Sequence, residues 1–327
     1  MNTSPKVSVV IPSYNCGRFL PETLDSVLSQ TFKDYEIIVI DDGSTDNTEQ
    51  IVKPYTNSIT YLRGPNKGAS AARNSGMKIA RGELVAFLDA DDLWDSEKLG
   101  AQVTFMDSHP KIGVNYTNCT FFDGLPPAAT GFEERDSALL RYSREKIANS
   151  DYILTGTSLL EDFLTIQAFP KPSTLMVRRQ CFEQVGYFDE TLYICEDTQM
   201  CLRLAKYFRF GYVDRPLVRR RVRTDTLSSA ADNRRYAAIH IQMFDDLSKW
   251  IALSDNEKAI TTRLVSSYCF SAGYAEFSDG RSASGRHHFQ KSFKTCANLR
   301  ALAYLLMTFL PLNWIKTFRI VKQQLAR

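Results

Sequence analysis

The sequence has no Cys-x-x-Cys spacing. Seven cysteines, an odd number, are scattered among 327 residues. Scattered cysteines without paired spacing argue against a disulfide framework and against a structural zinc site. They favour a reducing compartment, so we expect a cytoplasmic protein.

Two other patterns are missing. No Gly-x-Gly-x-x-Gly follows a predicted strand, which argues against a dinucleotide-dependent oxidoreductase. No signal peptide is visible, because Lys6 leads straight into a strand pattern, VSVVIP.

Long apolar runs are also absent. The most apolar stretch, 301–312, is broken at Pro311 and is shorter than the ~20 residues that a spanning helix needs. Trp314 and four basic residues follow it. This pattern predicts a kinked amphipathic pair of helices lying on the inner face of an anionic membrane. Packing of these last helices against the core is the alternative that the sequence leaves open.

The net charge of +3 is too small to argue for a nucleic-acid partner, and we expect none. Charge is unevenly distributed, however. Residues 215–235 contain seven arginines and two aspartates, and residues 300–327 contain five basic residues and no acidic one. Such local excess suits phosphate groups or an anionic membrane face.

Apolar runs alternate with segments of helical spacing in the first part of the chain. Runs at 7–11, 36–40, 59–62, 84–88 and 112–117 predict buried strands. Strand alternating with helix predicts an α/β fold with a mostly parallel sheet covered by helices. Beyond residue 226 the spacing is only helical. We therefore expect two domains, 1–226 and 227–327, with an insertion of short helices at about 121–169, over the site.

Three carboxylates follow the central predicted strand directly. Leu84 to Leu88 is a continuous apolar run, and Asp89, Asp91 and Asp92 come next. Ligands of open α/β sheets bind at the carboxyl ends of such strands. Crowded carboxylates repel one another unless a cation lies among them, and a divalent ion completed by phosphate oxygens is the natural occupant. A solvated acidic turn is the alternative.

Further motifs appear along the chain: PSYN at 12–15, NKGASAARN at 66–74, RRQCFEQVGYFDE at 178–190, ICEDTQMCLRL at 194–204 and PLVRRRVRTDTLSS at 216–229. With the strands that end in aspartates at 41–42 and 89–92, this ordered set resembles the inverting glycosyltransferases of family 2, over roughly residues 6–225. The resemblance implies a Rossmann-like GT-A fold that binds a nucleotide-diphospho-sugar, followed by a helical C-terminal region. It also implies sugar transfer, from a UDP-sugar, to a hydroxyl of a glycan or lipid-linked saccharide in cell-surface glycan or polysaccharide synthesis.

The resemblance implies a nucleotide site made by Pro12, Tyr14, Asn15, Asp41, Asp42, Asn66, Gly68 and Arg73. Its chemistry is reasonable, since a carboxylate such as Asp42 accepts well from an imide N–H and the ring of Tyr14 can stack on a base. Arg73 would frame the base and ribose with Asn66 and Gly68. The residues alone leave two alternatives: Tyr14 packing on the helix at Phe19, and Arg73 as a surface residue.

The resemblance also implies a metal site at the central aspartates. Asp91 would bind Mg²⁺ or Mn²⁺ directly, and Asp89 and Asp92 would hold ribose or metal-bound water, with Ala90 between them in the donor site. The ion would bridge the diphosphate and stabilise charge as the nucleoside diphosphate leaves. The sequence does not decide which aspartate makes the direct bond.

A second acidic pair, Glu196 and Asp197, stands at the start of a predicted helix. Inversion needs one base on the sugar face opposite the leaving group. The resemblance makes Asp197 that general base, with Glu196 beside it in the substrate site. A purely structural pair at a helix N-terminus is the alternative.

One position departs from the family pattern. The family often has Arg-x-His after its last extended segment, whereas this chain has Arg221, Val222 and Arg223. Arginine cannot ligate a metal but can grip phosphate with two N–H groups. We therefore expect Arg223 to bind the donor phosphates. A solvated basic strand is the alternative.

Two rival functions remain at this point. A haloacid-dehalogenase-type phosphatase also uses Asp-x-Asp after a strand, but it wants Thr or Val where Leu93 stands and gives no role to Asp41, Asp42 or Asp197. A catalytically degenerate protein that only binds nucleotide sugars is the second rival.

Overall fold

The computed structural model describes residues 4–122, 141–156, 158–223 and 233–310. The chain divides into two compact units, Met1–Arg223 and Thr224–Arg327. The domain boundary expected near residue 226 lies in the segment 224–232, outside the described residues. Each unit is described separately.

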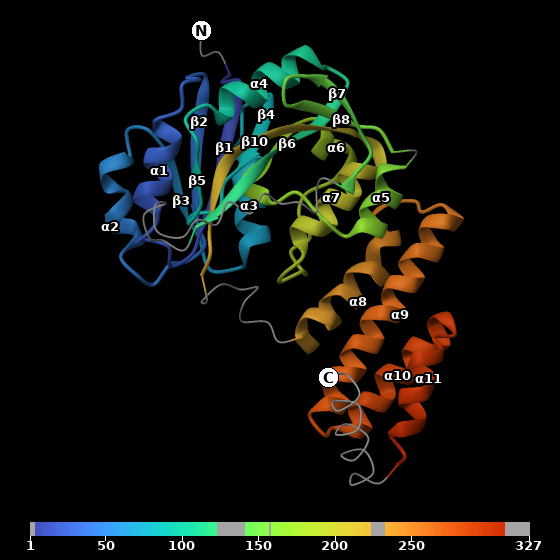
Figure 1. Cartoon of the computed structure of the whole chain (residues 1–327). Helices are drawn as coiled ribbons and strands as arrows, with labels where there is room; N and C mark the ends of the chain where they lie inside the picture. The colour runs from blue at the N-terminus through green and yellow to red at the C-terminus, as the bar shows by residue number, and fades with distance from the viewer. Residues whose placement is uncertain (1–3, 123–140, 157, 224–232, 311–327) are drawn as a thin grey trace. The chain divides into compact units, whose positions relative to one another are not determined.

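One sheet organises the first unit, in the order β3-β2-β1-β4-β9-β6-β10-β8-β7, with β5 paired to β10 (Figure 1). Its strands are β1 (Val7–Ser13), β2 (Tyr35–Asp41), β3 (Thr60–Arg63), β4 (Leu84–Phe87), β5 (Leu93–Trp94), β6 (Ile112–Phe122), β7 (Arg144–Ala148), β8 (Asp151–Leu154), β9 (Leu175–Arg178) and β10 (Arg209–Arg221). The expected α/β fold with a mostly parallel sheet is confirmed.

Parallel pairing brings the functional ends of the strands together. β1 pairs in parallel with β2 and β4, β2 with β3, and β6 with β10. β9 runs antiparallel to both β4 and β6, so these two also share a direction. The carboxyl ends of six strands therefore meet at one edge, the edge where ligands of α/β sheets bind.

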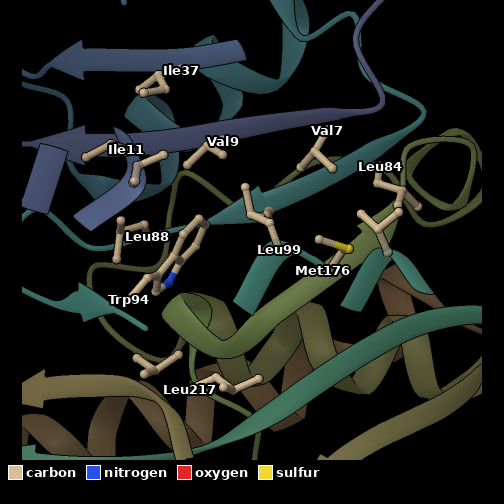
Figure 2. Packing of buried hydrophobic residues seen from close by; sticks show 14 of the residues in the cluster. Val7, Val9, Ile11, Ile37, Leu84, Leu88, Trp94, Leu99, Met176 and Leu217 are labelled. Atoms are coloured by element: carbon tan, nitrogen blue, oxygen red, sulfur yellow. The ribbon is translucent and has the colours of Figure 1, made fainter. Parts of the chain in front are cut away.

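Helices cover both faces of this sheet (Figure 1). They are α1 (Leu20–Leu28), α2 (Thr48–Val52), α3 (Ala69–Ile79), α4 (Lys98–Ser108), α5 (Leu159–Ile166), α6 (Cys181–Val185) and α7 (Glu196–Tyr207). On one face, alternate residues of β1 and β4 pack with α1 and α4, and Figure 2 shows Val7, Val9, Leu84, Leu88 and Leu99 in this cluster. Strand side chains alternate between faces, so one run of apolar residues supplies two cores.

The opposite face requires a close approach of α3. A Cβ on Gly76 would lie 2.5 Å from Cγ1 of Val10, so only glycine lets this helix rest on β1. Phe87 of β4 packs on this face against Phe182 and Phe188, with ring centroids 6.2 and 5.4 Å away. The position of α3 fixes where its polar residues meet the sheet edge.

The insertion differs from the expectation of short helices alone. Its described part contains the hairpin of β7 and β8, which joins the sheet through β10, in addition to α5. Residues 123–140 and 157 of the insertion lie outside the described residues. Asn47 precedes α2, and the Ser44 hydroxyl accepts a hydrogen bond from the Asn15 N–H.

The second unit consists of helices in its described part: α8 (Asn233–Trp250), α9 (Asp255–Ser278), α10 (Ser282–Cys296) and α11 (Leu299–Met307). A capping box starts α9, where Ser254 and Glu257 each bond the other's backbone N–H. Phe277 and Phe289 form a small core with Phe270 and Tyr304 around them. Over the described residues, no helix combines the length and apolarity needed to cross a membrane. Trp314 and the basic residues after it lie outside the described residues.

Candidate active site

Three loops at the sheet edge are bound to one another by predicted nucleotide-site residues. Asn15, with φ of 50°, accepts at Oδ1 from the Thr45 N–H at 2.8 Å. Asp41 is fully buried and accepts from the Ser44 N–H at 2.7 Å and the Tyr61 hydroxyl at 2.5 Å. Asn15 and Asp41 thus hold the loops in place through hydrogen bonds within the chain.

Asp42 binds the third loop, which leads into α3. Its two oxygens accept from the N–H groups of Lys67 and Gly68, at 2.8 and 2.7 Å. Burial raises the pKa of this carboxyl, against the effect of the two N–H donors. Gly68 has φ of 93°, a conformation that favours glycine, and starts α3 there. Each carboxylate oxygen retains a lone pair, so Asp42 can accept from a base as well.

The remaining nucleotide-site residues differ in exposure. Pro12 is buried within β1, Asn66 is exposed, and Tyr14 is 46% exposed. A half-exposed ring at the sheet edge can stack on a base, whereas a ring packed on α1 would be buried. The exposure of Tyr14 argues against the packing alternative and leaves its ring accessible.

Arg73, which the resemblance implies beside the base and ribose, is bound to carboxylates of two other segments. It is 4% exposed, and its guanidinium donates to Oδ1 of Asp89 and to Oε1 of Glu196, both at 2.7 Å. Burial opposes its charge, but the carboxylates of Asp89 and Glu196 raise the pKa of Arg73. Arg73 is thus a buried bridge between the turn after β4 and the start of α7, and the surface alternative was wrong.

The three central aspartates face three different partners. Asp89 accepts from Arg73, and Asp91 accepts from Nη1 of Arg223 at 2.8 Å. Asp92 is buried and accepts from the Ser173 hydroxyl at 2.6 Å and the Arg221 backbone N–H at 2.9 Å. Ala90 between them is buried, and its carbonyl accepts from the Thr23 hydroxyl.

In this arrangement each carboxylate of the expected metal site is bound to a protein partner. In the part of the chain that the structure describes, no group of three or more His, Cys, Asp or Glu side chains is placed to hold a metal ion. Asp92 is turned toward Ser173, and burial followed by the charge of Asp89 raises its pKa to about 7. Asp91 is more accessible than Asp92, and its partner is the side chain of Arg223. Asp91 therefore fits as a single carboxylate ligand, with phosphate oxygens completing the shell.

The acidic pair starts α7 as expected. Cys195 before it has φ of 68°, a strained conformation for a residue with a side chain, and turns the chain into the helix. Glu196 points to Arg73, and burial raises the pKa of its carboxyl. Asp197 is half-buried, and its Oδ1 accepts from the N–H of Thr198 at 2.7 Å. Its second oxygen can receive a proton.

Sequence reasoning missed two residues that shape the site. The Ser173 hydroxyl donates to Asp92 and accepts from the Asp89 N–H at 3.1 Å, but a lone serine before a strand carries no motif. The Phe19 ring lies under the guanidinium groups of Arg18, Arg221 and Arg223, at 4.4, 4.7 and 4.6 Å. Such contacts hold arginines in place through the ring's negative face.

Comparisons with known proteins agree with this geometry. Residues 8–161 match the model of "Glycosyl transferase family 2". An uncharacterised glycosyltransferase of Rickettsia typhi is 30% identical over 231 residues, which cover 70% of this chain and 68% of the relative. The UDP-Glc:alpha-D-GlcNAc-diphosphoundecaprenol beta-1,3-glucosyltransferase WfaP of Escherichia coli is 43% identical over 114 residues, 34% of this chain and 45% of WfaP.

Two solved structures have the same fold. TarS 1-349 of S. aureus in complex with UDP-GlcNAc has a TM-score of 0.61 at 21% identity, over 92% of this chain and 84% of TarS. The mannosyltransferase PcManGT of Pyrobaculum calidifontis, in complex with GDP-Man and Mn²⁺, has a TM-score of 0.53 at 17% identity, over 94% of this chain and 80% of that one. Fold, motifs and sequence relatives agree, and the chain belongs to glycosyltransferase family 2, as a GT-A transferase enzyme of glycan synthesis.

Proposed function

We propose that this chain transfers a sugar, with inversion, from a UDP-sugar to a hydroxyl of a glycan or a lipid-linked saccharide. The observation that carries the proposal is the Arg73 bridge. One buried guanidinium ties the turn containing Asp91 to Glu196, the neighbour of Asp197. A donor-holding turn and a free carboxylate oxygen at the start of α7 thus belong to one rigid network at the ligand-binding edge of the sheet.

The donor half of the proposal rests on the three bound loops. Tyr14 offers an exposed ring, and Asp42 an acceptor, at the same sheet edge. Arg223, beside Asp91, supplies N–H donors for phosphate oxygens. The UDP-GlcNAc complex of TarS supports a UDP-sugar by analogy of fold.

Asp91, with the Asp89 carboxylate nearby, is the proposed holder of Mn²⁺ or Mg²⁺. A bound ion would neutralise the diphosphate and so favour its departure. The chain itself contributes Arg223, which balances the charge of Asp91 when no donor is present and is placed to contact the donor's phosphates.

Asp197 is the proposed general base. It takes the proton of the acceptor hydroxyl as that oxygen bonds to the anomeric carbon. The bond from that carbon to the diphosphate oxygen breaks on the opposite face, and its electron pair leaves with the nucleoside diphosphate. The N-terminus of α7 favours negative charge on Asp197 before the transfer.

The acceptor half rests on likeness to WfaP, whose acceptor is a sugar on diphosphoundecaprenol. A lipid-linked acceptor places the reaction at a membrane surface. We therefore include peripheral membrane contact by the C-terminal unit in the proposal. Family membership argues against the Asp-x-Asp phosphatase alternative.

The test is a panel of nucleotide sugars, first by thermal shift with and without Mn²⁺ and then by release of nucleoside diphosphate. We expect a UDP-sugar to raise the melting temperature and to be hydrolysed slowly without an acceptor. Stabilisation without any release, even with saccharide acceptors, would instead support the degenerate donor-binding protein.

A further inference from the structure

The last described helix presents an apolar face to solvent. On α11 and the turn after it, Leu299, Ala303, Leu306 and Leu310 recur at helical spacing and are exposed, Leu299 by 75% and Leu306 by 62%. The opposite face of α11 packs inward through Ala301 and Tyr304. α11 therefore has apolar residues on both faces, and the apolar stripe on its exposed face is typical of an interaction surface.

A fixed turn extends this stripe. Arg286 of α10 donates to the Thr308 hydroxyl and carbonyl, both at 3.1 Å, and its guanidinium lies 3.9 Å from the Phe309 ring. Phe309 is 63% exposed, although Thr308 beside it is buried. These contacts hold Phe309 outward next to Leu306, so the protruding ring is a built feature of the unit.

The surroundings of the stripe are basic. Residues 280–310 contain Arg281, Arg286, Lys291, Lys294 and Arg300 and no Asp or Glu. Arg281 and Lys291 pair with carboxylates of α9, the turn after it, and α8. For Arg286, Lys294 and Arg300, the described residues include no carboxylate partner. Exposed apolar side chains in a unit with unneutralised cations match the acyl and headgroup layers of an anionic bilayer.

We propose that the α11 face, defined as Leu299, Ala303, Leu306, Phe309 and Leu310, docks on an anionic lipid bilayer with the help of the exposed cations Lys294 and Arg300 of the same unit. This proposal assigns residues and a lipid class to the membrane contact in the proposed function. It rests on the proposed function in one respect, that a lipid-linked acceptor requires the protein at a membrane. Charge decides against a second copy of the same face, because pairing two such faces would bring cations against cations. Lipid binding is read separately from sugar transfer, so either proposal can fail alone.

The test is flotation of the full chain with vesicles of phosphatidylcholine and phosphatidylglycerol (3:1), and with phosphatidylcholine alone. We expect recovery with the anionic vesicles at least about tenfold above that with neutral ones, and a fall in it as salt rises. Leu306→Ser with Phe309→Ser should lower the partition coefficient about tenfold or more. Lys294→Gln with Arg300→Gln should lower it to a similar extent.

The matched control is Leu62→Ser with Ile79→Ser, two exposed apolar residues of the first unit, 45% and 39% exposed. It should float like the unchanged protein. All variants alter exposed side chains, and circular dichroism with a melting curve verifies their folding. Equal flotation of the control and the α11 variant, Leu306→Ser with Phe309→Ser, would overturn the proposal. So would failure of the unchanged protein to float, or a concentration-dependent dimer in sedimentation that only the α11 variant loses.

Discussion

Asp91 and Arg223 lie 132 positions apart in the sequence, and Nη1 of the arginine lies 2.8 Å from Oδ2 of the aspartate. Burial and then the charge of Asp89 raise the pKa of the Asp91 carboxyl, and Arg223 opposes that rise. The guanidinium therefore stabilises the charged form of the residue proposed to serve the donor. It occupies the position where the family often has histidine.

Replacing Arg223 tests whether it contacts the donor. Arg223→Ala should weaken UDP binding by about tenfold, the value of one charge-assisted hydrogen bond. Arg223→His should restore much of the affinity if the family geometry holds. Isothermal titration calorimetry measures both variants. UDP affinity that is indifferent to both changes would make Arg223 a partner of Asp91 only.

Metal dependence forms a second prediction. Nucleotide binding should need a divalent ion, because Asp89, Asp91 and Asp92 repel a diphosphate that arrives without one. Calorimetry with UDP in Mn²⁺ and then in excess EDTA measures this. Undiminished affinity in EDTA would show that Arg223 and its neighbours suffice.

Asp197→Asn should slow transfer by ~10²–10⁴-fold, the usual contribution of general-base assistance. The amide keeps the shape of the side chain but cannot take the proton. UDP affinity should stay within about threefold, or ~0.6 kcal/mol, since Asp197 should not touch the nucleotide. Initial rates with a lipid-linked or glycan acceptor measure the first effect, and calorimetry the second.

Glu196→Gln is the control for that change. Because Glu196 binds Arg73, the control should affect stability more and transfer less than Asp197→Asn does. If Asp197→Asn transferred sugar at the normal rate, the base would lie elsewhere in the chain. If it lost UDP affinity, Asp197 would belong to the donor site.

The Arg73 bridge should be costly to break. Arg73→Met leaves two carboxylates without their buried partner, so the free energy of unfolding should fall by about 3–5 kcal/mol. Adding Glu196→Gln should recover part of this loss, because one of the uncompensated charges is removed. Urea denaturation measures the free energy of unfolding of the unchanged protein, of Arg73→Met and of the double variant. Arg215→Met, at an exposed pair with Glu97, should cost less than about 1 kcal/mol.

A buried lysine gives a pH prediction. Lys98 is fully buried, donates to Gln102 at 2.6 Å, and burial lowers its pKa well below the usual value. The folded protein thus binds fewer protons than the unfolded chain. Stability should therefore rise with pH up to the unfolded pKa of about 10.4, with a slope approaching ~1.4 kcal/mol per pH unit from this group.

Lys98→Met should remove that slope, which urea denaturation between pH 7 and pH 10 measures. The exposed Lys294→Met should keep it. A slope unchanged by Lys98→Met would mean that Lys98 stays charged in the folded protein.

The sequence predicted the parts of the site that depend only on neighbouring residues in the chain. The aspartates after β4 and the start of α7 at Glu196 follow directly from an apolar run meeting charge. The role of Arg73 could not be predicted, because its two partners are 16 and 123 positions away. A buried arginine in a helix of small residues looks like a surface residue until the fold brings carboxylates to it.

Strand direction was equally hidden. The first three residues of β9, Leu175 to Val177, are apolar in the same way as those of β4, so nothing local shows that β9 runs antiparallel between β4 and β6. The hairpin strands β7 and β8 are short and partly exposed, which weakens the alternation that marks a strand. Ser173, placed by the turn before β9, is a result of that same topology.

The end of β10 lies at the aspartate turn, where Arg221 binds Asp92 through its backbone and Arg223 binds Asp91 through its side chain. The residues that support the turn are therefore the last ones before the chain enters its helical unit. These contacts decide how short a catalytic fragment can be. A fragment that ended with β10 at Arg221 would keep the whole sheet but would lack Arg223, the cation beside Asp91.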